Sequence, residues 1–121
     1  KKQVPWSVNG PALKFVKAVV QDSEYLKKTW EKTSRLRFYL IQQLFNLDAS
    51  KDWVYPGKSF LSWVWVDMKS KKAASKAVYL ARETGGPVRN GKPGYGCETF
   101  VKVSGGKKEP VQGVIKAWKA L

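Results

Sequence analysis

The stretch that most constrains the fold is residues 59–82, SFLSWVWVDMKSKKAASKAVYLAR. Its first ten residues are rich in β-branched and aromatic side chains and contain neither Gly nor Pro, which is typical of a β-strand. Because side chains alternate across a strand, this one has two apolar faces: Leu61, Trp63 and Trp65 on one side, and Phe60, Val64, Val66 and Met68 on the other. The strand is therefore either buried on both sides or keeps its aromatic face for a ligand.

A lysine-rich helix follows this strand directly. Small apolar residues recur at helical spacing over residues 70–82, and Ser70 is a candidate N-cap. Lys71 and Lys72 would then open the first turn, where cations oppose the helix dipole. A bound anion, held by free N–H groups and lysines together, would offset that cost. The pattern indicates a phosphate-binding helix start, and the alternative is a row of solvated lysines.

The net charge of the chain makes a polyanion the leading class of partner. The sequence holds 23 Lys and Arg against 9 Asp and Glu, which gives +14, and both halves of the chain share the excess. Only four of these cations are Arg. Lysine suits phosphate contacts, whereas bidentate reading of bases favours arginine. We therefore expect binding dominated by the nucleic-acid backbone, with modest sequence preference.

The scarcity of catalytic residue types argues against an enzyme. The chain has no histidine and one cysteine, Cys97, so catalytic triads, thiol–imidazole pairs, most zinc sites and internal disulfides are excluded. A magnesium nuclease would need clustered carboxylates, and Asp67 and Glu98 are the pair to consider. Phe100, however, stands where such nucleases commonly carry a lysine. We expect no catalysis, no metal and no cofactor.

The sequence also predicts where the protein works. A single cysteine fits a reducing compartment, and no apolar run approaches transmembrane length. The first residues lack the apolar core of a signal peptide. We expect an intracellular protein, in the cytoplasm, nucleoid or nucleus, with a membrane disfavoured as its partner.

Periodicity and turn signals predict a single α+β domain spanning residues 1–121, with residues 1–10 as an extended lead-in. The expected order is α-α-α-β-α-β-α, from helices at 11–21, 23–33 and 34–47, a strand at 59–68, a helix at 70–82, a strand at 97–103 and a helix from 109 onwards. The second and third helices can equally be one. A further strand near residues 53–55 or 88–89 would complete a small antiparallel sheet.

Most aromatic residues are assigned to the core. The strongest amphipathic signal lies between Arg37 and Phe45, so this helix is expected to anchor the core. The aromatic residues placed in the core are Trp30, Phe38, Phe45 and Trp118. Two tryptophans on one central strand are more often core than ligand platforms, which favours burial for at least one of Trp63 and Trp65.

The remaining aromatics suggest a platform for bases. Cation-lined aromatic side chains bind single-stranded nucleic acids at about 1–3 kcal/mol per stacked base. Loop aromatics have fewer packing obligations than helical ones, so those near the tryptophan face are candidates. The residues predicted to stack on bases are Trp53, Tyr55, Trp63 and Tyr95.

The sequence thus predicts a non-enzymatic nucleic-acid-binding protein, DNA or RNA, with single strands slightly favoured over duplex. The predicted phosphate contacts are Lys69, Lys71, Lys72, Lys76, Arg89 and Lys92. One alternative is a duplex-binding winged helix, with residues 70–82 as recognition helix and residues 89–92 as the turn of the wing. Another is a basic membrane-surface or protein-interaction module. A long apolar strand in a small sheet is also compatible with a homo-oligomer.

Overall fold

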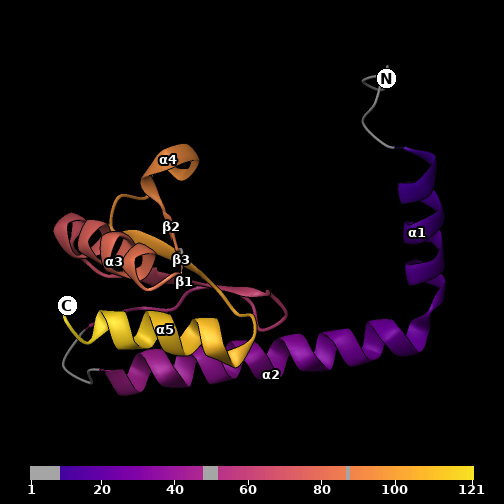
Figure 1. Cartoon of the computed structure of the whole chain (residues 1–121), viewed down its shortest axis with the longest axis horizontal. Helices are drawn as coiled ribbons and strands as arrows, with labels where there is room; N and C mark the ends of the chain where they lie inside the picture. Colours follow the sequence, from indigo (N-terminus) through magenta and orange to yellow (C-terminus); the bar gives the residue numbers. More distant parts are fainter. Residues whose placement is uncertain (1–8, 48–51, 87) are drawn as a thin grey trace. The chain divides into compact units, whose positions relative to one another are not determined.

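The computed structural model describes residues 9–47, 52–86 and 88–121, and these form five helices and a three-stranded antiparallel sheet (Figure 1). The predicted α+β class is confirmed. The chain divides into two compact units, Lys1–Lys32 and Thr33–Leu121. The first eight residues of the expected lead-in lie outside the described residues.

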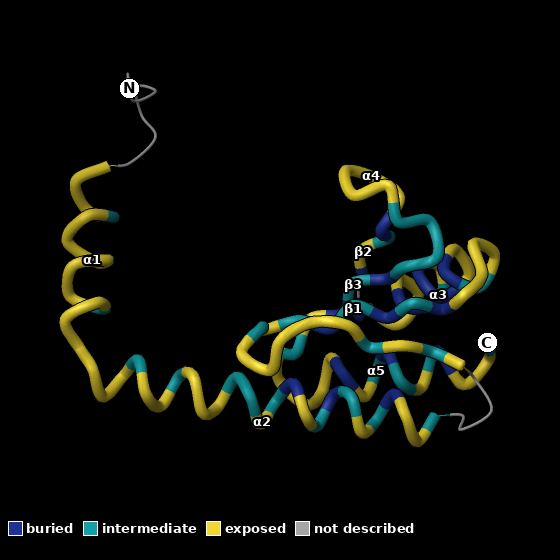
Figure 2. The backbone as a smooth tube through the Cα atoms, turned by 180° about the vertical axis from the view of Figure 1, so that it is seen from behind, coloured by how far each residue is buried: buried dark blue, intermediate teal, exposed yellow. Residues whose placement is uncertain are grey.

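The first unit contains α1 (Gly10–Gln21) and the first turns of α2 (Ser23–Leu47). The predicted cap is confirmed, since the Asn9 side chain accepts a 2.8 Å hydrogen bond from the Ala12 amide. The described part of this unit contains no buried residue, and Figure 2 shows α1 without the dark blue of buried positions. Residues 23–47 form one helix rather than two, because no Gly or Pro interrupts the run.

The second unit is organised around the sheet. Its strands are β1 (Trp63–Asp67), β2 (Arg89–Asn90) and β3 (Phe100–Ser104), in the order β1-β3-β2. Both pairings are antiparallel. Val54 adds an isolated bridge to Asp67. The sequence predicts a further strand near residues 53–55 or 88–89. The structure has a two-residue strand at 89–90 and a single bridge at 54.

Two of the remaining helices, α3 (Lys71–Glu83) and α5 (Lys108–Trp118), contribute residues to the core on one face of this sheet. A third, the short α4 (Lys92–Tyr95) between β2 and β3, does not. The predicted cap of α3 is confirmed, because Ser70 Oγ accepts from the Ala73 amide at 3.3 Å. Gly85, with φ +71°, ends the helix as its sequence position predicts.

The core lies between the sheet and the helices. Alternate strand residues point into it, together with one side of α3, α5 and the last turns of α2; the strand residues are Val64, Val66, Val101 and Val103. Trp118 is fully buried; its Nε1 donates a 2.9 Å hydrogen bond to the Ala77 carbonyl and its ring meets Trp53 edge-on at 5.8 Å. The assignment of Trp118 to the core is confirmed.

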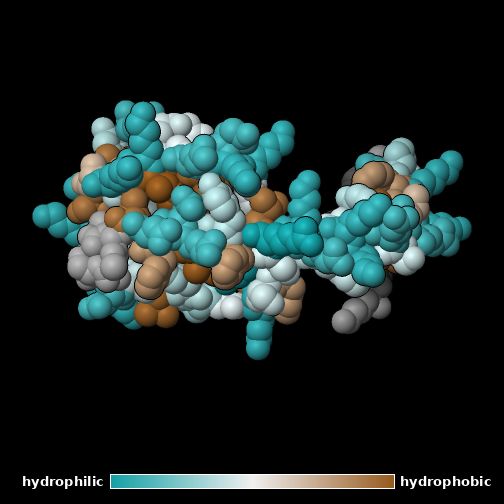
Figure 3. Space-filling view, turned by 90° about the horizontal axis from the view of Figure 1, so that it is seen from below, coloured by the Kyte–Doolittle hydropathy of each residue, from teal (hydrophilic) through white to brown (hydrophobic). Residues whose placement is uncertain are grey.

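The assignment of three other aromatics to the core is wrong. Trp30, Phe38 and Phe45 are 64%, 62% and 62% exposed. The core side of α2 is set by Arg37, Leu40 and Leu44, and each phenylalanine lies about 100° further round the helix than its buried neighbour. Trp30 belongs to the unit whose described residues include no buried position. Figure 3, seen from the side on which α2 lies in Figure 1, shows apolar surface among the hydrophilic side chains of the second unit.

Arg37 is the one buried charged residue of the described chain. Its guanidinium donates to the Trp63 carbonyl and, at 3.5 Å, to the Pro56 carbonyl. Burial lowers the pKa of this guanidinium. These bonds join α2 to the start of β1 and to the loop before it, which fixes where the aromatic strand begins.

Candidate nucleic-acid interface

The face of the sheet opposite the core carries aromatic and cationic side chains side by side. The register places Trp65, Lys102 and Arg89 in one row across the three strands. Trp63 and Phe100 lie on the same face, since each is an even number of residues from a member of that row on its own strand. None of these five belongs to the buried core.

The contacts of these rings come from the same face. Trp65 meets Tyr95 at 5.2 Å and Phe100 at 5.9 Å between ring centroids, both edge-on. Tyr95 comes from α4 and is 48% exposed. The structure therefore brings the predicted Trp63 and Tyr95 to one surface. We call this surface, made of Trp63, Trp65, Tyr95, Phe100, Arg89 and Lys102, the aromatic face.

Two cations of the aromatic face lie over its rings. The Lys102 ammonium is 4.2 Å from the centroid of the Trp63 ring, and the Arg89 guanidinium is 5.1 Å from that of Tyr95. Such cation–π contacts at exposed sites are worth about 0.5–1 kcal/mol. They hold positive charge directly against the rings.

Trp53 and Tyr55 do not join this surface. Both pack against the core, and burial raises the pKa of the Tyr55 hydroxyl. The bridge from Val54 to Asp67 explains why: it places Val54 on the outer side with Asp67 and turns its two neighbours inward. The expectation that these loop aromatics lie near the tryptophans is corrected. The expectation that at least one of Trp63 and Trp65 is buried in the core is likewise corrected, since both are only partly buried and neither belongs to the core.

The sequence contained a signal for the residues that the prediction missed. Trp65, Phe100 and Lys102 were not among the candidate residues for binding. Phe100 and Lys102 alternate with Val101 and Val103, so one apolar and one mixed face were visible on that strand. Pairing the mixed face with the tryptophan face of residues 59–68 would have found them. The sequence does not specify that pairing, because register depends on partners distant in the chain.

The predicted phosphate-binding cations divide into groups with different partners. Lys69 pairs with Asp67 at 2.9 Å, and Lys76 donates to the Ala120 carbonyl at 2.6 Å. Lys71 and Lys92 both pair with Glu98. Lys72 and Lys76 line an open groove of about 250 Å³ beside Ser70. Arg89 alone of the six is part of the aromatic face.

The two carboxylates at this end of the sheet are both held by lysines. The hydrogen bonds and charges of Lys71 and Lys92 lower the pKa of Glu98. Burial raises the pKa of Asp67, but hydrogen bonds from Lys69 and Thr99 outweigh it and leave the pKa lowered. Both groups are therefore charged at neutral pH. Among the described residues there is no cluster of three or more His, Cys, Asp or Glu side chains that could hold a metal ion.

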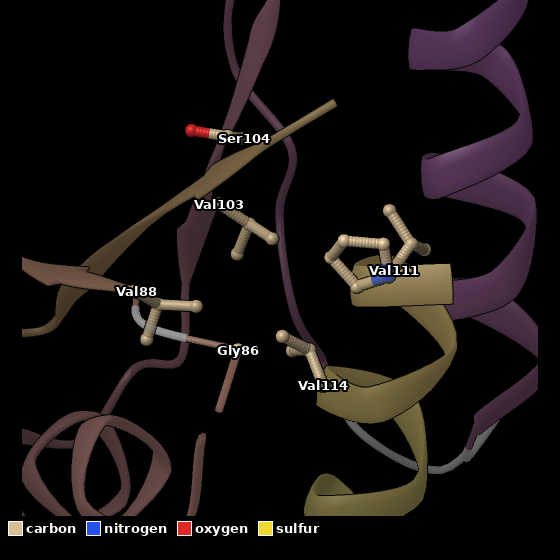
Figure 4. A pocket seen from close by; sticks show the side chains of 7 residues that line it. Gly86, Val88, Val103, Ser104, Val111 and Val114 are labelled. Carbon is tan, nitrogen blue, oxygen red and sulfur yellow. The ribbon is translucent and has the colours of Figure 1, made fainter. Parts of the chain in front are cut away.

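An apolar cavity of about 70 Å³ lies between the sheet and α5 (Figure 4). Val103 of β3, the two valines of α5 and Val88 line it, and its lining includes no charged side chain. Ligand pockets usually hold about 300–1,000 Å³. The cavity is a packing gap beside the core and not a ligand site.

No protein-family model, no curated protein and no solved structure matches the chain. No helix in the part of the chain that the structure describes is long and apolar enough to cross a membrane.

Proposed function

We propose that this protein binds single-stranded nucleic acid on the aromatic face, without catalysing a reaction. One observation carries the proposal: four aromatic rings and two cations share the face of the sheet opposite the buried core. An aromatic platform beside positive charge is the usual arrangement for binding single strands with little sequence preference. The net charge of +14 adds long-range attraction to any nucleic acid.

The rings explain why single strands are preferred. Bases in a duplex are stacked on one another, so their faces are closed to aromatic side chains, whereas unpaired bases can be splayed out and stacked. Trp63 and Trp65 are two residues apart on one strand, which separates them by about 6.6 Å. A base that stacks on Trp63 would replace the Lys102 ammonium over that ring. The displaced ammonium then reaches a neighbouring phosphate.

A duplex-binding mode is the second candidate, supported by the outer side of α3. Lys72, Lys76 and Tyr79 lie there at helical spacing, and all three are exposed. The helix that should precede a recognition helix by three or four residues is not found, since β1 leads directly into α3. This departs from the helix-turn-helix arrangement, so duplex binding ranks second.

Fluorescence anisotropy with labelled single strands of DNA and RNA and a matched duplex tests the proposal. Trp65→Ala should weaken single-strand binding by about 1–3 kcal/mol, the value of one stacked base, and Trp65→Phe should retain part of it. Trp30→Ala is the matched control, because Trp30 is exposed on α2 outside the aromatic face. Thermal melts of each variant separate loss of binding from loss of folding.

Three results would count against the proposal. Equal affinity of the Trp65→Ala and Trp30→Ala variants would remove the aromatic face from the interface. Preference for duplex, with Tyr79→Ala more damaging than Trp65→Ala, would favour α3 as the binding element. Absence of binding at low salt would exclude nucleic acid as the partner.

A further inference from the structure

Two lysines from different elements converge on one carboxylate at the end of the aromatic face. Lys71, in the first turn of α3, pairs with Oε2 of Glu98, and Lys92, in α4, lies 3.4 Å from Oε1. The Glu98 side chain is 32% exposed, and both lysine side chains are more than 70% exposed. The three side chains therefore form an accessible cluster, defined here as the Glu98 clamp.

The charges around the clamp favour an anion between the two lysines. Lys71 stands where the helix dipole is positive, and α3 has no acidic residue in its first turn. Glu98 supplies that negative charge from outside the helix. Its two oxygens, each facing one ammonium, are arranged as two oxygens of a phosphate group would be. Exposed ion pairs of this kind contribute little to stability, so exchange of one anion for another is not opposed by folding.

The clamp is continuous with the aromatic face. Glu98 lies two residues before Phe100, and Lys92 lies three residues before Tyr95. β3 starts beside the end of β1, where Met68 donates a 3.0 Å hydrogen bond to the Thr99 carbonyl. A single strand that follows Trp63 and Trp65 along β1 reaches the clamp at the end of that path.

We propose that Lys71 and Lys92 bind one backbone phosphate of a nucleic acid and that Glu98 occupies their place in the free protein as an internal competitor. This inference rests on the proposed function and extends it by one defined phosphate site and a residue that limits affinity. Glu98 leaves the lysines when the phosphate arrives, and no covalent bond changes.

Neutralising the competitor tests the inference. Glu98→Gln should tighten binding of a single-stranded oligonucleotide by about two- to fivefold, the effect of one exposed ion pair. Glu109→Gln is the control, since it removes the same charge from the exposed first turn of α5. The Glu98→Gln gain should exceed that of the control.

The lysines provide the second half of the test. Lys71→Gln/Lys92→Gln should weaken binding and reduce the slope of log K against log salt by about 0.7, the loss of one phosphate contact to a single strand. Adding Glu98→Gln to that double variant should gain no more than adding Glu109→Gln. Thermal melts confirm that each variant is folded.

The outcomes separate this inference from the proposed function. If the wild type binds and Trp65→Ala weakens it, but the double lysine variant keeps the wild-type salt slope, the clamp is refuted and the aromatic face stands. The same holds if Glu98→Gln gains no more than Glu109→Gln. If the wild type binds no oligonucleotide at low salt, both proposals fall.

Discussion

The two faces of the sheet are made by alternate residues of the same strands, yet they have opposite compositions. Towards the helices, β1 and β3 present four buried valines. Away from the helices they present Trp63, Trp65, Phe100 and Lys102, none of which is fully buried. The valine face needs only shape and hydrophobicity to fill a core. The aromatic face keeps large rings and charged groups partly exposed outside the core, which is the property expected of a binding surface.

The comparison also shows that size and hydrophobicity do not decide burial in this chain. The tryptophans of β1 remain partly exposed, while the smaller valines that alternate with them, Val64 and Val66, are completely buried. Position along the strand decides whether a side chain is buried, because consecutive residues of a strand point to opposite faces of the sheet. Substitutions at adjacent positions should therefore have effects of different kinds.

The largest expected effect is loss of folding when a charge is placed on the valine face. Val101, on the central strand, is 0% exposed, so Val101→Asp would bury an unpaired carboxylate at a cost of several kcal/mol. That is comparable to the whole stability of a small domain. Circular dichroism should show no cooperative thermal transition for Val101→Asp, whereas the neighbouring Lys102→Gln should melt close to the wild type. Equal melting of the two variants would contradict the distinction between the faces.

A smaller effect is expected where the chain turns to place Tyr95 on the aromatic face. Gly91 donates a 2.8 Å hydrogen bond to the Phe100 carbonyl, and a Cβ at this position would lie 2.9 Å from the same oxygen and against the Cys97 carbonyl. Gly91→Ala should therefore cost about 1–3 kcal/mol of unfolding free energy through overpacking and weaken oligonucleotide binding. Gly106→Ala is the control, since nothing lies within 4 Å of its Cβ. Chemical denaturation measures both, and equal stabilities would show that the turn tolerates a side chain.

The smallest effect is a dependence of stability on acid pH that arises at the end of the aromatic face. The pKa values of Asp67 and Glu98 are both lowered in the folded protein by their lysine partners. A carboxyl group whose pKa is lowered by folding stabilises the protein above its unfolded pKa, and this contribution disappears as pH falls through the folded pKa. Stability from these pairs should be constant from pH 7 to about 5 and decline below about pH 4.

Denaturant titrations at a series of pH values measure this decline. Asp67→Asn and Glu98→Gln should each make it shallower, because the substituted side chain no longer titrates. A decline of wild-type steepness in both variants would assign the acid sensitivity to other carboxyl groups.

Much of the local structure could be predicted from residue patterns. Asn9 and Ser70 cap helices as expected, and alternation assigned Val64 and Val66 to one face of β1 and the tryptophans to the other. These features depend on neighbours within four residues, so the sequence carries them directly. The exposure of Phe38 and Phe45 could not be predicted from local patterns. Helical periodicity shows which side of a helix is apolar, but it does not define which residues at the border of that side are buried.

The candidate site was only partly predictable. Trp63, Tyr95 and Arg89 were identified from the sequence and lie together on the aromatic face. Trp65, Phe100 and Lys102 were missed, and Trp53 and Tyr55 proved to pack against the core. The missed and the misplaced residues both depend on pairing between distant parts of the chain. The antiparallel register of β1 with β3 places Phe100 and Lys102 beside the tryptophans, and the bridge at Val54 turns its two neighbours inward.

By itself, the sequence determined the charge of +14, the positions of most helices and the two-faced character of each strand, since these follow from composition and short-range periodicity. Only the tertiary structure decided which face the helices cover, which aromatics meet, and that Lys71 and Lys92 share Glu98. Those outcomes depend on contacts between residues far apart in the chain. Their free energy comes from packing and pairing that no local pattern encodes.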